Sequence, residues 1–222
     1  GTMTGTMTGT TIGSAKGKFI TVEGTEGVGK TTNIQRITEW LDERGIAYIS
    51  TREPGGTALG EKIRDLLLDK DNTGMAASAE LLLMFAARAQ HLEEKIIPAL
   101  AAGTWVLCDR FTDATYAYQG FGRGLNLEHI ERLEALVQGD LHPDFTLILD
   151  IDPELGMSRV RARGELDRFE SEALEFFDRV RAGYRERAND NPSRYCLVDA
   201  SAPLTVVQER IVEALNAFVG EG

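Results

Sequence analysis

One short segment constrains the fold of this chain more than any other. Residues 24–31 read Gly-Thr-Glu-Gly-Val-Gly-Lys-Thr and match the pattern G-x-x-x-x-G-K-[ST]. A β-rich run at 19–23 precedes the segment, and a helical pattern from Thr32 to Arg44, closed by Gly45, follows it. A strand, a glycine loop and a helix in this order direct backbone N–H groups and the helix N-terminus at one point. We therefore expect the chain to bind a nucleoside triphosphate.

The pattern also assigns roles within this phosphate loop. The Lys30 side chain can reach the outer phosphates, and the Thr31 hydroxyl can bind Mg²⁺. The candidates for triphosphate binding are the loop residues and the first residues of the helix: Gly24, Thr25, Glu26, Gly27, Val28, Gly29, Lys30, Thr31 and Thr32. The loop alone does not say what the bound phosphate is used for.

Length and charge limit the remaining possibilities. With 222 residues the chain is long enough for one α/β domain, which we expect over 17–222. The low-complexity residues 1–16 are expected to be a disordered leader or a tag. A net charge of −11 argues against a nucleic-acid-coating protein, although a local arginine cluster can still bind a small anion. The sequence has no run of 18 apolar residues, so we expect no membrane span. Cys108 and Cys196 are expected to be free thiols in a reducing cytoplasm.

Apolar runs alternate with helical patterns along the chain. The runs lie at 18–23, 46–50, 104–108, 145–150 and 195–198. Strands that alternate with helices indicate right-handed crossovers and a parallel sheet covered by helices on both faces. In such sheets ligands bind beyond the carboxyl ends of the strands. Polar residues close the strands at those ends, namely Glu23, Arg52, Glu53, Asp109, Arg110 and Asp150.

Two of these strand ends carry candidate phosphate ligands. Asp109 could bind the metal or its water, and Arg110 could bind a substrate phosphate, but an ion pair between the two is an equal alternative. Arg52 precedes the Pro-Gly-Gly turn at 54–56 and could form a forked contact with a phosphate. The alternative for Arg52 is a surface ion pair, which we favour less because this strand end should border the same crevice.

Two helical segments carry candidates for recognition of a base and sugar. Phe85 and Arg88 lie three residues apart on a predicted helix from Glu80 to Leu100, so that an aromatic ring could stack on a base beside a hydrogen-bond donor. Core packing is the commoner role for an isolated aromatic residue, and for His91 a local hydrogen bond or solvent exposure is the more common role. The segment 112–123 supplies further hydroxyl and amide groups.

Arginines cluster in a third segment, around Gly164. Arg159, Arg161, Arg163 and Arg168 interrupt an otherwise acidic chain. A lid over about 159–170 could place these guanidinium groups against a phosphoryl group during its transfer. The alternative is a solvated face on which some of these arginines only form ion pairs.

Taken together, these segments resemble the bacterial thymidylate kinases over residues 18 to about 215. The resemblance is carried by 23–32, Thr-Arg-Glu-Pro-Gly-Gly-Thr at 51–57, Leu-Met-Phe-Ala-Ala-Arg at 83–88, Asp-Arg-Phe at 109–111, Ala-Tyr-Gln-Gly at 117–120 and Arg-Ala-Arg-Gly-Glu-Leu-Asp-Arg at 161–168. It implies a P-loop nucleoside-monophosphate-kinase-like fold with a five-stranded parallel sheet. It also implies a cytoplasmic homodimer that uses ATP and Mg²⁺ to convert dTMP to dTDP for dTTP supply.

The resemblance further implies a role for each site residue. Arg52 and Arg110 would hold the dTMP phosphate, with Thr31 and Asp109 near the metal. Glu26 would approach the 3′-hydroxyl, and Tyr118 would pack on the sugar. Arg88 would donate to thymine, with Thr115 and Gln119 completing the base pocket. The family places its stacking aromatic four residues before this arginine, where this chain has Met84, so that either Met84 or Phe85 would cover the base.

A catalytic arginine in this family comes from the phosphate loop or from the lid. The loop of this chain has Val28 and no arginine. The lid class is therefore implied, with Arg161, Arg163 and Arg168 as candidates beside Lys30 and Arg110. Phe121 also replaces an expected glycine in the 120–124 stretch.

Two rival functions share the phosphate loop. A GTPase-like nucleotide switch needs Asn-Lys-x-Asp, which the sequence lacks, and the D-x-x-G match at 71–74 follows no predicted strand. Another nucleotide or deoxynucleoside kinase would share both the loop and the arginine lid. An assay of ADP release, with dTMP, dUMP, dCMP, thymidine and AMP compared as acceptors, distinguishes these kinases.

Overall fold

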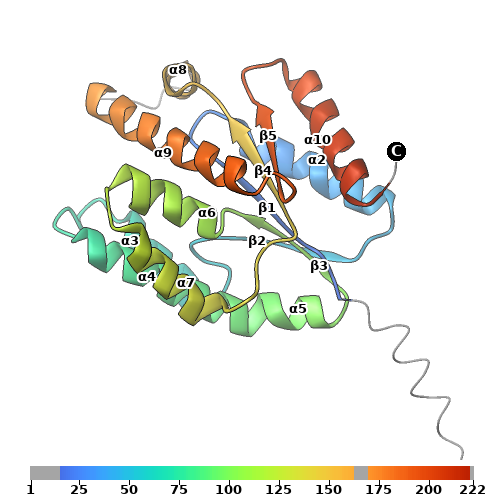
Figure 1. The fold of residues 1–222 in the computed structure, drawn as a ribbon, viewed down its shortest axis with the longest axis horizontal. Helices are drawn as coiled ribbons and strands as arrows, with labels where there is room; N and C mark the ends of the chain where they lie inside the picture. The colour runs from blue at the N-terminus through green and yellow to red at the C-terminus, as the bar shows by residue number, and fades with distance from the viewer. Residues whose placement is uncertain (1–15, 163–169, 221–222) are drawn as a thin grey trace, which may run out of the picture.

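A parallel sheet of five strands forms the centre of the molecule in the computed structural model, which describes residues 16–162 and 170–220 (Figure 1). The strand order is β2-β3-β1-β4-β5. The strands are β1 (Phe19–Gly24), β2 (Tyr48–Arg52), β3 (Trp105–Asp109), β4 (Phe145–Asp150) and β5 (Tyr195–Asp199). Every pairing is parallel, which confirms the predicted fold class. The carboxyl ends of all strands therefore meet at one edge, where ligands bind in such sheets.

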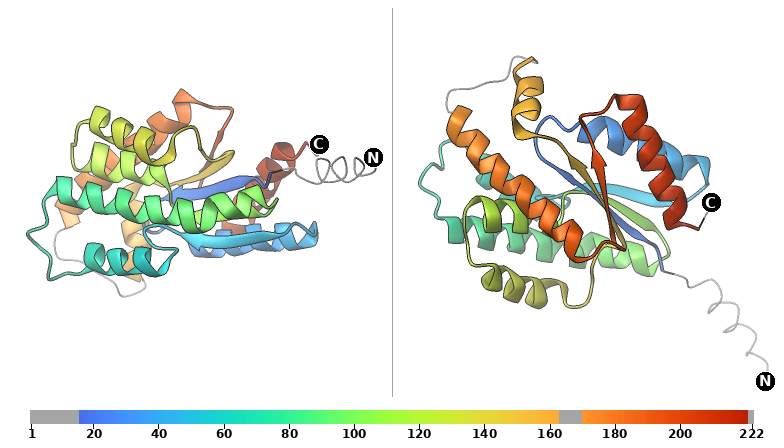
Figure 2. Two further views of the ribbon diagram at one scale, coloured as in Figure 1. Left: turned by 90° about the horizontal axis from the view of Figure 1, so that it is seen from below. Right: turned by 45° about the horizontal axis from the view of Figure 1, so that its top comes forward.

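Helices cover both faces of this sheet (Figures 1 and 2). One face carries α2 (Lys30–Glu43) and α10 (Leu204–Phe218). The other face carries α5 (Ile97–Ala101), α6 (Thr112–Thr115) and α9 (Glu170–Asp190), together with the π-helical η2 (Tyr116–Gly122). The remaining helices are α3 (Ala58–Leu68), α4 (Ala77–His91), η1 (Leu92–Ile96), α7 (Leu127–Gln138) and α8 (Pro153–Ala162).

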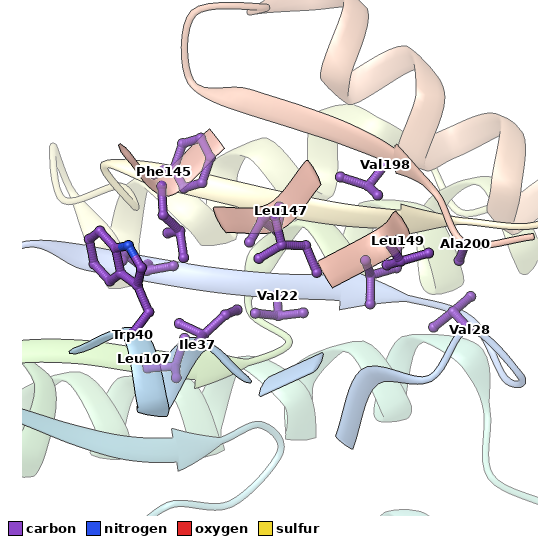
Figure 3. Close-up of a cluster of buried hydrophobic side chains, with 14 of the residues drawn as sticks. Val22, Val28, Ile37, Trp40, Leu107, Phe145, Leu147, Leu149, Val198 and Ala200 are labelled. Atoms are coloured by element: carbon purple, nitrogen blue, oxygen red, sulfur yellow. The ribbon is translucent and has the colours of Figure 1, made fainter. Parts of the chain in front are cut away.

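Alternation along β1 separates two apolar layers. Ile20 and Val22 point into a buried cluster shared with α2 and α10, whose members include Ile37, Leu147 and Ile211 (Figure 3). Phe19 points to the opposite face, into a cluster with η1 and α5. Because successive side chains of a strand point to opposite faces, a strand buried on both faces is mostly apolar. This explains why the strands appear in the sequence as continuous apolar runs.

The second strand begins later than its apolar pattern predicts. The predicted run was 46–50, whereas β2 spans Tyr48–Arg52. The end of α2 accounts for the difference: Gly45 adopts φ 64°, and the Ile46 N–H donates to the Leu41 carbonyl at 3.0 Å. This bond spans five residues, as in a Schellman motif, and it uses Ile46 for helix termination.

The predicted helix from Glu80 to Leu100 is longer and less regular than expected. Residues 77–101 form one continuous rod of α4, η1 and α5 (Figure 2, left). The π-helical segment lies just before Pro98, which has no N–H to donate to the preceding turn. Met84, Arg88 and His91 all lie on the α4 part of this rod. The rod brings them beside the carboxyl ends of the strands, where the site lies.

Candidate active site

The phosphate loop is anchored on both sides. Val28 is buried in the apolar cluster, and Gly29 caps α2 with φ 80°. Gly27 also has a left-handed φ of 81°, and a Cβ atom there would lie 2.3 Å from the Gly156 carbonyl oxygen of α8. Only glycine suits both the conformation and the close approach. The loop and the start of α2 are thereby held against α8.

Lys30 and Asp109 meet in the wall of a cavity of about 370 Å³ at this loop. Lys30 Nζ donates to Asp109 Oδ1 at 2.7 Å. Burial, followed by the nearby Arg110 guanidinium, lowers the pKa of Lys30, and Asp109 opposes this shift. Arginine side chains line the same cavity, which makes it a site for anions. Its lining also includes Thr25, Glu26, Thr31, Thr32, Arg52 and Arg64.

Arg110 has a strained backbone and an unused donor. Its φ of 68° is the only positive value at a non-glycine residue in the described ranges. Its Nη2 lies 3.3 Å from the Tyr118 hydroxyl and 3.7 Å from Glu26 Oε1. Its Nε is buried and has no hydrogen-bond partner among the described residues. Strain and an unpaired buried donor both mark sites built for a ligand. Burial also raises the pKa of Tyr118 to about 12, so its hydroxyl stays protonated.

Arg52 lies at the mouth of this cavity with a partner that the sequence did not reveal. Its Nη2 donates to Glu61 Oε1 at 2.6 Å, and Glu61 Oε2 accepts the Gly56 N–H at 2.8 Å. Arg64 of α3 lines the same cavity and was missed in the sequence. The sequence did contain an indication of this position. Arg64 lies four residues after Gly60, so both residues lie on the face of α3 that packs against the rest of the protein. Burial and the neighbouring Arg52 lower the pKa of Arg64.

A smaller cavity, of about 80 Å³, lies next to the anion site. It is formed where β2, α4 and the α6–η2 segment converge. Most predicted base and sugar contacts line it: Met84, Arg88, Arg110, Thr115, Tyr118 and Gln119, together with Glu53, Pro54, Phe111 and Ala114. Phe85 is not in this lining; it is buried against Leu81, Tyr116 and Ile130. Of the two candidates for covering a base, the structure thus places Met84 in the cavity wall.

A carboxylate missed in the sequence fixes Gln119 in this wall. Glu80 Oε1 accepts from Gln119 Nε2 at 2.8 Å, and the Arg123 guanidinium lies 3.3 Å from the same carboxylate. Glu80 lies four residues before Met84 on α4. This spacing puts both side chains on one face of the helix and was the indication in the sequence that Glu80 belongs to the site. Because its amide nitrogen is bonded to Glu80, Gln119 has a defined orientation at the cavity.

The predicted lid lies partly outside the described residues. Arg163 and Arg168 fall in the gap between 162 and 170. Arg161 lies exposed in the last turn of α8. Arg159 has a different position from that expected of a lid residue: its Nη1 donates to the Gly27 carbonyl at 3.3 Å and the Ala200 carbonyl at 3.0 Å. It thus joins α8 to the phosphate loop and to the loop after β5.

A phosphate loop within an arginine-lined anion cavity, with a small second cavity adjoining it at the carboxyl edge of this sheet, defines a P-loop nucleotide kinase. The family model for thymidylate kinase matches residues 22–211. The chain is 62% identical over 203 residues to a thymidylate kinase of Teredinibacter turnerae, covering 91% of this chain and 99% of that protein. It is 57% identical over 199 residues to one of Pseudomonas entomophila, covering 90% and 94%. The chain belongs to the thymidylate kinase family.

A solved structure gives the same result. The crystal structure of a thymidylate kinase from Ehrlichia chaffeensis superposes with a TM-score of 0.73 and 35% sequence identity. The match covers 90% of this chain and 99% of that one.

Proposed function

We propose that this protein transfers the γ-phosphoryl group of ATP to dTMP, giving ADP and dTDP. One observation carries the proposal: Arg110 and Glu53 line both the anion cavity above the phosphate loop and the base-sized cavity. A nucleoside monophosphate in the small cavity would have its phosphate at Arg110, facing the γ-phosphate bound by the loop. Phosphoryl transfer needs chiefly this alignment and compensation of charge.

The donor nucleotide would be held by the loop amides, Lys30 and Thr31. The residues present also fit Mg²⁺, which binds proteins through one or two oxygen ligands and completes its shell with phosphates and water. Thr31 and Asp109 line the same cavity, and only one oxygen of Asp109 is bonded to Lys30. When bound, the ion would neutralise charge on the phosphates. The described residues contain no cluster of three or more His, Cys, Asp or Glu side chains suited to a metal.

The acceptor would be bound along the line between the two cavities. Arg110, with Arg52 and Arg64, would hold the dTMP phosphate, and Glu26 would approach the 3′-hydroxyl. Tyr118 would pack beneath the deoxyribose, leaving little room for a 2′-hydroxyl. Arg88, Thr115 and Gln119 would contact thymine, and Met84 would cover it. Because the acceptor phosphate is already anionic at neutral pH, no strong general base is required.

The catalytic arginine would come from the lid, because the loop has Val28 at the relevant position. Arg161, Arg163 and Arg168 are the candidates. Arg159 is bonded to two backbone carbonyls and is the least suitable of the four arginines. A guanidinium group brought to the γ-phosphoryl would compensate charge that develops in the transition state.

We also propose a homodimer formed through α3, α4 and α7, in the cytoplasm. Five of the large exposed apolar side chains lie on these helices: Leu59, Leu66, Leu68, Leu82 and Leu136. Helix α4 contacts both α3 and α7 (Figure 1). Exposed apolar side chains on adjoining helices are typical of an interface. No helix in the described ranges is long and apolar enough to cross a membrane, and the acidic charge disfavours a nucleic-acid partner.

Coupled release of ADP tests the reaction directly. The assay compares dTMP, dUMP, dCMP, thymidine and AMP as acceptors, with and without EDTA. We expect the highest kcat/KM for dTMP and loss of turnover with EDTA. A preference for AMP or thymidine would reject the proposed acceptor, and full turnover in EDTA would reject the role of Mg²⁺.

A further inference from the structure

A buried chain of hydrogen bonds lies directly behind Arg88. Its other members, Glu53, His91 and Thr51, were not assigned a substrate contact above. Arg88 Nε donates to Glu53 Oε1 at 2.6 Å, and His91 Nδ1 lies 2.7 Å from Glu53 Oε2. His91 Nε2 in turn lies 2.8 Å from the Thr51 hydroxyl. The side chains of Arg88 and Glu53 are 3% exposed and that of His91 is 0% exposed. Water therefore has little access to Arg88, Glu53 and His91, whereas Thr51, at the outer end of this chain of bonds, is only half-buried.

The direction of these hydrogen bonds follows from the chemistry of the groups. An ionised carboxylate only accepts hydrogen bonds, so His91 Nδ1 must carry the proton that it donates to Glu53. In the neutral imidazole, Nε2 then accepts from the Thr51 hydroxyl. Glu53 thus uses one oxygen for Arg88 and the other for His91, and it cannot rotate without breaking one of two buried bonds.

The Arg88 guanidinium is held on its remaining sides as well. Its Nη1 donates to Thr115 Oγ1 at 3.0 Å. Its Cζ lies 5.0 Å from the ring centre of Phe85 and 5.2 Å from that of Phe111. Two rings and two hydrogen bonds define both the plane and the rotation of the group. Nη2 has no hydrogen-bond partner among the described residues, and Arg88 lines the small cavity.

His91 connects this arrangement to the turn after β2. A Cβ atom on Gly56 would lie 2.3 Å from His91 Nε2, so the turn backbone lies directly against the imidazole. The Gly56 N–H donates to Glu61, the partner of Arg52, and its carbonyl accepts from Lys95 Nζ at 3.0 Å. A change at His91 would therefore reach both the base side and the phosphate side of the site.

We propose that Glu53 and His91 are positioning residues that aim the Arg88 guanidinium at the acceptor base and thereby set its selectivity. The inference deepens the proposed function and depends on it. A guanidinium donates only, so a fixed one favours a pyrimidine with a carbonyl oxygen at position 4 over one with an amino group there. If Arg88 were free to rotate, it would lose part of this discrimination. The selectivity at stake is therefore that of dTMP over dCMP.

The test compares two substitutions at His91. His91→Leu keeps a branched side chain of similar size but removes both hydrogen bonds. His91→Asn can place an amide N–H near the position of Nδ1 and restore the bond to Glu53. The measured quantity is the ratio of kcat/KM for dTMP to that for dCMP, with the melting temperature recorded for each variant. Thr51→Val removes only the outer bond and serves as the milder variant if His91→Leu does not fold.

We expect the ratio to fall by on the order of tenfold in His91→Leu, less in Thr51→Val, and to recover toward the wild-type value in His91→Asn. Tyr195→Phe is the control, because it removes a buried hydrogen bond to Asp113 that involves none of Arg88, Glu53 and His91. It should lower the melting temperature without changing the ratio. An unchanged ratio in folded His91→Leu, or in Thr51→Val if His91→Leu does not fold, would overturn the inference. If wild-type protein did not prefer dTMP, the proposed function itself would fail instead.

Discussion

At the scale of single residues, the charged side chains of the site differ in their exposure to water. Lys30 is mostly buried, whereas its partner Asp109 is about one-third exposed, at 36%. Removing the lysine therefore leaves a carboxylate that water can solvate, and the fold should tolerate the change. The apolar layers around the loop do not depend on the Lys30–Asp109 bond.

We expect Lys30→Ala to lower kcat by on the order of a thousandfold or more, because it removes the cation nearest the transferred phosphoryl group. The coupled assay gives kcat, and circular dichroism during heating shows whether the fold is kept. Thr38→Ala on α2, which removes only a solvent-exposed hydrogen bond to the Gln35 carbonyl, is a control that should retain activity. A folded Lys30→Ala protein with kcat near the wild-type value would contradict the role of Lys30.

A second residue-scale prediction concerns Glu23 at the end of β1. Its carboxylate accepts the Phe111 N–H at 2.8 Å and the Tyr184 hydroxyl at 2.8 Å. Burial, followed by the nearby Asp113 carboxylate, raises the pKa of Glu23 to about 8, against the opposing effects of these hydrogen bonds and of Lys30. Between the ordinary value of 4.5 and about 8, the folded state thus holds a proton that the unfolded state has lost.

The free energy of unfolding should therefore fall as pH rises from about 5 to about 8, by up to ~1.4 kcal/mol per pH unit from this group. Above that range both states are ionised and the slope from Glu23 vanishes. Glu23→Gln, which is neutral at every pH, should remove this part of the slope. Urea unfolding of both proteins at pH 5.5, 7 and 8.5 measures the difference. Parallel pH profiles for the two proteins would show that Glu23 is not the titrating group.

At the scale of elements, the contact between α8 and the phosphate loop is set by two glycines. A Cβ atom on Gly156 would lie 2.6 Å from the Glu26 carbonyl oxygen. Alanine is a better helix former than glycine, so the local helix would gain stability while the loop would have to move. Gly156 thus favours the position of the phosphate loop at the expense of the stability of α8.

We expect Gly156→Ala to raise the KM for ATP by about tenfold or more, because small displacements of a binding loop are costly. The melting temperature should change little. Gly74→Ala is a matched control, since a Cβ atom there meets no atom within 4 Å. Equal KM values for Gly156→Ala and the wild type would mean that the loop adapts to the added methyl group without loss.

At the scale of the whole molecule, apolar side chains are exposed unevenly. Leu82 is 57% exposed on α4 and Leu136 is 79% exposed on α7. On the opposite side of the sheet, Leu204 of α10 is 49% exposed. The first two belong to the surface that we propose to be the dimer interface, and the third does not.

Leu82→Glu should convert a dimer to a monomer, because a buried unpaired carboxylate at a symmetric interface faces its own copy and costs several kcal/mol. Sedimentation velocity at micromolar concentration measures the change. Leu204→Glu should leave the association state of the wild type unaltered. A wild-type protein that sediments as a monomer, or a Leu82→Glu variant that stays dimeric, would exclude this surface.

Most of the architecture could be predicted from local patterns. Strands β1 and β4 were visible because they are buried on both faces, and the phosphate loop was visible because its function requires glycines and a lysine at fixed spacing. The exact start of β2 could not be predicted, because Ile46 is apolar but is used to end α2. Candidate site residues were found where they end strands, as Arg52, Asp109 and Arg110 do.

The sequence by itself determined the strands, the triphosphate loop and the family, since each is signalled by motifs of residues close together along the chain, whereas the strand order joins distant segments. Only the tertiary structure decided which side chains surround Arg88. Glu53, His91 and Thr115 come from three separate segments, and a hydrogen bond between them leaves no periodic signal. It also decided that Met84 rather than Phe85 lines the base-sized cavity. Adjacent residues on a helix point about 100° apart, so one enters the site and the next enters the core, and only packing determines which.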